Sequence, residues 1–435
     1  MNSLPSLQSL TTTWADQQSL AQQPALAKVQ TKARAQLRAM PFPDRKTEAW
    51  KYTSLHALQN PNVWKNGVAT AAVSSEWENE SAVHLRFVNG QLQQQQINTE
   101  TVKLTAFSEL SADELARYLP LMELNDYWQA HPFAQLNEAT VDQSWLLVVK
   151  ANQRINGPIV LEQWASGESA FAANLRVLVV VEANAEATLV QVTECNSQAE
   201  TVLLNGLLQI QVNDNASLNH IQLQLAAENC LQAQGSSIRL ARDSRYQHFA
   251  VQLGSNLIRN DLYLQFMQPG AEANLQGAFL CKHSQHIDNH LTLEHISGRC
   301  QSTTRYKGLV TDQGKAVFNG RIHIHPNAQK TDAQLNNRNL LLSDQAEINT
   351  KPELEIYADD VKCAHGASIG QLSENSLFYF ESRGIDKATA EAMLSFGFVN
   401  EIVEQLPIEW LADAVSKRLV SYFRDVKQLG GLWQL

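Results

Sequence analysis

Short runs of alternating hydrophobic and polar residues dominate the middle of the chain, from about residue 143 to residue 370. Asn, Asp, Gly or Pro separates one run from the next, and such alternation is typical of a strand with one buried face. Examples of these runs are NLRVLVVVE, ATLVQVTE, SLNHIQLQL, DLYLQFM and HLTLEHIS. This region is therefore predicted to consist almost entirely of β-strands.

The strand pattern repeats with a nearly constant period. Small residues recur every 28 or 29 positions in five successive segments, namely Ala187, Ala216, Ser244, Ala273 and Ser302. A second family of strands recurs between them at looser intervals of 25 to 33 residues. A period in this range predicts a β-solenoid, in which each turn is covered by its neighbours, rather than a propeller, whose blades are about 40 residues long.

Before this core, the pattern is mainly helical. Residues 25–40 contain good helix formers and end at a proline, and residues 108–118 predict a second helix with Ser111 as its N-cap. A short strand is expected at residues 83–88. Directly after the first predicted helix, the segment PFPDRKTEAWKYTSL is interpreted as a surface loop anchored by a buried Trp50, with a docking motif as the alternative.

After the core, the helical period returns. Residues 386–406 predict a broadly apolar helix with Asp386 as its N-cap, and Pro407 ends it before a second helix. So apolar a surface has to pack on the end of the solenoid or on a partner. The chain thus divides into a mainly helical domain (1–142), a β core (143–370) and a C-terminal helical domain (371–435).

Composition narrows the function classes. The 435 residues carry a formal net charge of −10, which disfavours nucleic acid as the main partner. Five scattered cysteines without a CxxC pair indicate a reducing compartment and no self-contained zinc or cluster motif. The first residues lack a signal-peptide pattern, and no apolar run approaches the length of about 20 residues that a membrane span needs. We therefore expect a cytoplasmic protein that neither binds nucleic acid nor enters a membrane.

One stretch, residues 350–370, gathers the most chemistry, and it reads TKPELEIYADDVKCAHGASIG. In a strand, Cys363 and His365 point the same way, about 6.5–7 Å apart, which suits part of a metal or sulfur site. Inert burial of the cysteine is the commoner alternative. The adjacent Asp359 and Asp360 face opposite ways in a strand, so they do not form a ready acid–base pair.

Other histidines are weaker candidates. The run KHSQHIDNHLTLEH places His286, Asp288 and His290 on one strand face, which we interpret as polar surface of the β core rather than a metal site. His323 and His325 share another strand face. They are expected to face solvent opposite two inward isoleucines, with metal binding as the alternative. The sequence contains no phosphate-loop, dinucleotide-binding or GxSxG signature.

Several long motifs resemble one family. The run LNNRNLLLSDQAEINTKPELEIYADDVKCAHGASIGQL, followed by LFYFESRGI, is similar to the C-terminal core of the SufB/SufD family of iron–sulfur cluster assembly proteins. GKAVFNGRIHI and RKTEAWKYTSL fit the same family. Phe380 stands where the SufB branch has a cysteine, so the resemblance is greater to the SufD branch. Residues 54–140 carry little of it.

The resemblance implies a right-handed parallel β-helix with helical segments at both ends, acting as a scaffold and not as an enzyme. It implies SufB as a partner through the core strands and the ATPase SufC through residues 371–435, with a homodimer as an option for the isolated chain. It also implies a transient iron–sulfur cluster shared with SufB, for which His365 is the ligand from this chain and Cys363 the weaker candidate. The cluster type and the delivery of sulfur and iron are left open.

A second function class is also compatible with a β-helix. Parallel β-helices also carry polysaccharide lyases and hydrolases, so a carbohydrate-active enzyme is the alternative, although a fold alone is weak support for an activity. Such an enzyme would need carboxylates or a basic residue grouped in a groove. Copurification with SufB and SufC, or cleavage of a polysaccharide by the lone chain, would separate the two.

Overall fold

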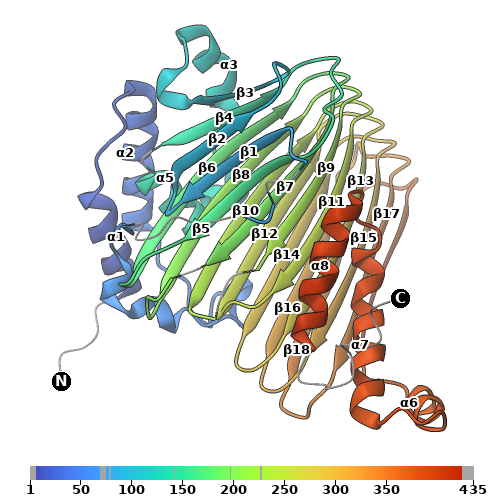
Figure 1. The fold of residues 1–435 in the computed structure, drawn as a ribbon. Helices are drawn as coiled ribbons and strands as arrows, with labels where there is room; N and C mark the ends of the chain where they lie inside the picture. The colour runs from blue at the N-terminus through green and yellow to red at the C-terminus, as the bar shows by residue number, and fades with distance from the viewer. Residues whose placement is uncertain are drawn as a thin grey trace.

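The computed structural model describes residues 6–68, 75–77, 80–141, 143–195, 197–225 and 228–423. Its core is a parallel β-solenoid between β4 (Ser144–Val149) and β19 (Lys362–Gly370), as Figure 1 shows. Successive strands alternate between two sheets, and each sheet receives eight of them, so the chain makes eight turns. The prediction of a solenoid with a period near 29 residues is confirmed.

The two sheets hold the even-numbered and the odd-numbered strands of the solenoid. The even sheet continues from β4 through β6 (Phe171–Val181), β8 (Val202–Val212), β10 (Cys230–Leu240), β12 (Leu257–Phe266), β14 (His286–His295), β16 (Lys315–Ile324) and β18 (Glu347–Ile356). The odd sheet contains β5 (Ile159–Ala165), β7 (Glu186–Cys195), β9 (Ser217–Gln224), β11 (Arg245–Leu253), β13 (Glu272–Cys281), β15 (Gln301–Val310), β17 (Asp332–Leu341) and β19.

Three earlier strands extend these sheets at the N-terminal end. The predicted strand at 83–88 is confirmed as β1 (Val83–Val88), which pairs parallel with β5 and antiparallel with β2 (Gln91–Ile97). In the other sheet, β3 (Val102–Ala106) pairs antiparallel with β4. The first solenoid turn is therefore covered by β3 on β4 and by β1 on β5, and these strands pair with its backbone hydrogen-bonding groups.

The pairing register corrects part of the predicted repeat. Ala216 and Ser244 occupy equivalent positions, as predicted, and so do Ala273 and Ser302. Ala216, however, follows the register of Ala185 rather than Ala187, and Ser244 is level with Ala271 rather than Ala273, an error of two residues in each case. Connections between turns differ in length, so positions counted at a fixed period shift away from the true strand register. A two-residue error keeps every side chain on its predicted face, because strand side chains alternate with period two.

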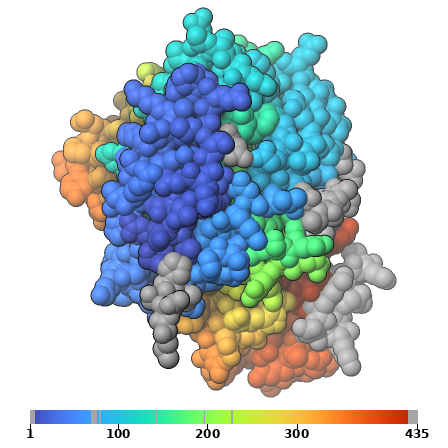
Figure 2. Space-filling model, turned by 90° about the vertical axis from the view of Figure 1, so that its left-hand side faces the viewer, coloured from blue at the N-terminus to red at the C-terminus, as the bar shows by residue number. Residues whose placement is uncertain are grey.

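The N-terminal helices cover the outer face of the even sheet. Their apolar side chains, among them Trp14, Leu37 and Trp50, pack with Leu203 and Leu231 of the sheet. Figure 2 shows this N-terminal layer spread over one face of the molecule. The helices and short 3-10 turns are α1 (Leu7–Gln17), α2 (Pro24–Ala39), η1 (Glu48–Trp50), η2 (His56–Gln59), η3 (Pro61–Val63), η4 (Phe107–Glu109), α3 (Ala112–Met122), α4 (Asp126–Gln129) and α5 (Pro132–Thr140).

The predicted N-cap of α3 is also confirmed. The Ser111 side chain accepts a hydrogen bond from the backbone N–H of Glu114, and the Glu114 side chain accepts one from the backbone N–H of Ser111. This reciprocal capping box satisfies two backbone donors that the first helical turn would otherwise leave free. The Trp50 side chain is buried, which confirms the interpretation of its segment as one anchored by this tryptophan.

The C-terminal helices are α6 (Glu374–Glu381), α7 (Lys387–Val403) and α8 (Glu409–Tyr422). The apolar sides of α7 and α8, including Phe396 and Val415, pack on the outer face of the odd sheet against residues such as Phe249 and Leu309. The apolar surface of these helices was expected to cover the solenoid end or to contact a partner. That expectation is wrong for the buried part of the surface, because this part packs on the side of the odd sheet. The Asp386 N-cap is confirmed by its hydrogen bond from the Thr389 backbone N–H.

The second predicted helix, which follows Pro407, corresponds to α8. Its residues from 424 onward lie outside the described part of the chain. In the ranges that the structure describes, no helix is both long and apolar enough to cross a membrane.

Candidate functional site at the open end of the solenoid

The last turn leaves both sheets with an edge. β18 pairs with β16 and β19 pairs with β17, and each is the terminal strand of its sheet. The outer backbone N–H and C=O groups of an edge strand are available to pair with another strand. Large apolar side chains are exposed along this edge, namely Ile356, Tyr357 and Ile369. The C-terminal end of the solenoid thus combines unpaired backbone with exposed apolar surface.

Cys363 and His365 lie on β19 at this end. Their register partners on β17 are Ala333 and Leu335, which are both buried in the solenoid core. Paired residues of parallel strands point the same way, so Cys363 and His365 face inward from the last turn. Because no further turn within the described residues covers them, His365 is exposed and Cys363 is half-buried. The expectation that both side chains share one strand face is confirmed.

His365 ends a continuous inward column of side chains, which we call the His365 column. From turn to turn it consists of Leu189, His220, His248, Leu275, Thr304, Leu335 and His365. Two of its members are thus histidines deep inside the solenoid, which the sequence reasoning missed. Their spacing of 28 residues, equal to the repeat, was the signal that could have found them.

The interior histidines are held in the neutral form. Burial lowers the pKa of His248 to about 4 and lowers that of His220 well below its ordinary value. The cause is desolvation, because a charged imidazole would lose its water without gaining a compensating partner. The His220 ring instead hydrogen-bonds the Tyr246 hydroxyl at 2.9 Å and the Gln191 side chain at 3.2 Å. These histidines are parts of the core.

The two candidate ligands at the open end differ in their readiness to bind a metal. Burial raises the pKa of the Cys363 thiol, and the nearby Asp332 carboxylate adds to the effect. A raised pKa keeps the sulfur protonated near neutral pH, whereas the thiolate is the form that binds metal. His365 is exposed at the same end. The exposed imidazole is therefore the better placed donor of the two.

Two acidic residues of this turn, Glu353 and Glu355, are engaged in ion pairs. Glu355 accepts two hydrogen bonds from the Arg321 guanidinium, at 2.8 and 3.0 Å, and this contact lowers the pKa of the Glu355 carboxyl. Glu353 pairs with Lys351 at 2.5 Å, and Lys351 also reaches Glu48 at 2.9 Å. These carboxylates stabilise the end of the sheet and its contact with the N-terminal layer, and they do not converge as an acid–base pair.

The face of His286, Asp288 and His290 is covered, so its interpretation as polar surface is wrong. Asp288 is 1% exposed and pairs with Arg259 at 2.6 Å, and the Arg259 guanidinium lies 4.2 Å from the Trp50 ring centroid. The segment around Trp50 folds over this part of the even sheet. The buried aspartate thus has a structural partner, which its strand pattern alone could not reveal.

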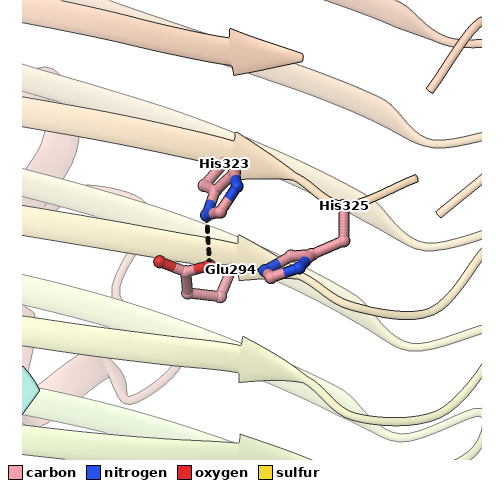
Figure 3. Close-up of side chains that lie close together, drawn as sticks. All are labelled: Glu294, His323 and His325. Atoms are coloured by element: carbon pink, nitrogen blue, oxygen red, sulfur yellow. Dashed lines mark hydrogen bonds and ion pairs between the residues drawn. The ribbon is translucent and has the colours of Figure 1, made fainter. Parts of the chain in front are cut away.

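His323 and His325 lie at the end of β16 and directly after it, on the outer face. The inward burial predicted for Ile322 and Ile324 is confirmed. The histidines do not project freely into solvent, because both imidazoles contact one carboxylate from the neighbouring strand, Glu294 (Figure 3). Sequence reasoning missed Glu294, which is separated from His323 by a full solenoid turn.

Comparison with known proteins identifies a family for this chain. Residues 164–398 match the family described as SUF system FeS cluster assembly, SufBD core domain. The chain is 32% identical over 389 residues to the iron–sulfur cluster assembly protein SufD of Escherichia coli K12, which covers 87% of this chain and 88% of that protein.

Two further relatives extend the comparison. An iron–sulfur cluster assembly SufBD family protein of Synechocystis is 29% identical over 391 residues, covering 86% of this chain and 85% of its own. The chloroplastic protein ABCI7 of Arabidopsis thaliana is 27% identical over 410 residues, covering 89% and 84%. The family match spans more than half of the chain, and the SufD match spans most of both proteins. This chain therefore belongs to the SufBD family of iron–sulfur cluster assembly proteins and is SufD-like.

Proposed function

We propose that this chain is a non-enzymatic scaffold subunit that builds and transfers nascent iron–sulfur clusters together with SufB and the ATPase SufC. The observation that carries the proposal is the uncapped last turn of the solenoid. It presents an exposed imidazole, His365, at the end of an otherwise buried inward column. No further turn of the described chain covers this residue, so a molecule that caps the solenoid would cover it.

The same end supports strand pairing with SufB. β18 and β19 are edge strands of sufficient length to extend both sheets into a partner, and main-chain pairing of this kind supplies affinity. Exposed Ile356, Tyr357 and Ile369 would become buried in such an interface. A homodimer of the isolated chain would use the same edge, so the two assemblies would exclude each other.

The docking of SufC is proposed at the C-terminal helical domain, residues 371–435. Within it, α7 and α8 use their apolar sides on the odd sheet, so the partner would contact other surfaces. α6 projects beyond the last turn in Figure 1 and exposes Phe378 and Tyr379. Exposed aromatic side chains are frequent anchors of protein interfaces. ATP-driven movement of SufC would then reach the nearby SufB–SufD end.

The cluster is cargo at this interface. Iron–sulfur clusters are normally held by four ligands. His365 would contribute one imidazole, with Cys363 as the second, weaker candidate, and SufB would supply the others. A site completed only by two chains fits transient assembly and release. All five cysteines of the chain are free thiols, which supports the cytoplasm as the site of action.

The test is the variant His365→Ala in a reconstituted complex with SufB and SufC. We expect the three proteins to copurify as with wild type, while cluster formation, followed by visible absorption, is abolished. His283→Ala is the matched control, since it removes an exposed histidine that pairs only with surface carboxylates. Normal cluster formation by the His365 variant would remove this residue from the mechanism, and failure to copurify would show that its role is structural.

A further inference from the structure

The outer face of the even sheet carries a second cluster of metal-ligand side chains. Glu294 lies on β14, and its register partner on β16 is His323, while His325 follows directly after β16. One ligand atom from each of these three residues lies within 4.8 Å of the other two. Figure 3 shows both imidazole rings directed toward the Glu294 carboxylate.

One carboxylate oxygen is the centre of this arrangement. Glu294 Oε2 lies 2.7 Å from Nδ1 of His323 and 2.8 Å from Nε2 of His325. Around a tetrahedral zinc ion with ligand distances of about 2.0–2.2 Å, neighbouring ligand atoms stand about 3.4 Å apart. Each imidazole nitrogen would therefore have to move away from Oε2 by only about 0.6–0.7 Å to admit an ion, and the two nitrogens already lie within 4.8 Å of each other.

The other carboxylate oxygen, Oε1 of Glu294, contacts an arginine instead of the two histidines. Glu294 Oε1 lies 3.3 Å from the Arg321 guanidinium, which itself forms a two-pronged ion pair with Glu355. Because Glu355 balances the charge of Arg321, the group around the two histidines keeps one negative charge from Glu294. A fixed outer oxygen leaves Oε2 free as a single-oxygen ligand, and such outer contacts orient metal ligands in proteins.

The cluster is partly buried but remains accessible. The Glu294 side chain is 9% exposed, His323 is 18% exposed and His325 is 35% exposed. The exposed Tyr357 packs edge-on against His323, with ring centroids 5.4 Å apart. An ion can therefore reach the histidines from solvent beside the last strand, while the carboxylate stays largely shielded from water.

From this geometry we propose that Glu294, His323 and His325 bind a divalent first-row transition-metal ion. Two imidazoles and one carboxylate suit Zn²⁺ or Fe²⁺, whereas Mg²⁺ and Ca²⁺ prefer oxygen ligands alone. Three protein ligands leave at least one coordination position open for water or for a group from another molecule. The site is separate from Cys363 and His365 and does not depend on the function proposed for them.

The test is a calorimetric titration of the chelator-stripped full-length chain with Zn²⁺. Wild type is expected to bind one ion at this site, and Glu294→Gln and His323→Gln are each expected to weaken this binding at least tenfold. Two control variants are expected to bind Zn²⁺ with the affinity of wild type. One is His283→Gln, which alters an exposed histidine near Asp312 and Glu228. The other is the double variant Cys363→Ser/His365→Ala, which separates this site from the proposed cluster site.

Folding of each variant is checked without metal by circular dichroism. The location of the ion in wild type is measured as well, because this measurement does not depend on the folding of a variant. Zinc-soaked crystals should show an anomalous difference peak between the three side chains. Zn²⁺ bound elsewhere with no peak at this position would overturn the proposal, as would unchanged affinity in both Glu294→Gln and His323→Gln, or no binding by wild type.

Discussion

A middle turn and the last turn of the solenoid both place a histidine in the same inward column, but the first histidine is buried and the second is exposed. His248 lies in the middle of the His365 column, where burial lowers its pKa to about 4. His365 occupies the equivalent inward position on the terminal strand and is exposed. The middle imidazole contributes to packing, whereas the terminal one is available to an incoming ligand or partner.

Position along the stack of turns determines the role of a residue in a solenoid. Each turn is stabilised by the turns on either side, so an inward side chain in the middle is surrounded on all sides. At an uncapped end the same direction leads to solvent. A functional residue can therefore be an ordinary member of the repeat that is exposed by its place in the order of turns.

The largest difference between the two regions is expected from truncation in the middle of the column. Leu275→Ala removes a fully buried side chain and leaves a cavity that the neighbouring turns cannot fill, so it should lower the free energy of unfolding by about 2–5 kcal/mol. Urea denaturation followed by circular dichroism measures this loss. A loss below about 1 kcal/mol would show that the interior is more loosely packed than the burial indicates.

A smaller, pH-dependent effect is expected from His248. The unfolded chain takes up a proton at this histidine below about pH 6.5, whereas the folded chain does so only near pH 4. Stability is therefore lost as the pH falls through this window, by about 2 kcal/mol between pH 7 and pH 5. His248→Leu, which introduces the residue type found at positions 189, 275 and 335 of the same column, should remove this part of the pH dependence in urea titrations.

Some pH dependence should remain in that variant, because burial also lowers the pKa of His220 and lowers that of His295 to about 3. An identical pH dependence in wild type and His248→Leu would contradict the assignment of His248 as a buried neutral imidazole.

The smallest effect on the free chain is expected at the open end. Ile369→Ala truncates a side chain that is already 46% exposed, so the free energy of unfolding should change by less than about 0.5 kcal/mol. In the complex with SufB the same change should weaken association, because the side chain would then be buried. Binding is measured by surface plasmon resonance. Equal affinity of the variant and wild type would place the interface elsewhere.

Alternation and period were sufficient to predict the solenoid, its extent and the shared strand face of Cys363 and His365. They could not predict its exact register, because connections of unequal length shift Ala187 by two positions from its expected partner. They also could not reveal which outer faces are covered. Asp288 reads as a surface residue in its strand, and only the folding of the Trp50 segment over Arg259 buries it.

The candidate sites were predicted to different degrees. His365 and Cys363 are close in sequence, so strand geometry alone places them together. The contact of Glu294 with His323 depends on pairing between β14 and β16 and becomes visible only with the correct register. Likewise, the apolar pattern of α7 shows that it must be covered, but the choice of the odd sheet follows from tertiary packing.

The central claim is that the open end of the solenoid is the surface that a partner covers. Hydrogen exchange of the chain, alone and in complex with SufB and SufC, tests this most directly. The account predicts slower exchange of amides in β18 and β19 on complex formation and unchanged exchange in β11 and β13. Equal exchange of β18 and β19 in the free chain and in a fully formed complex would contradict it.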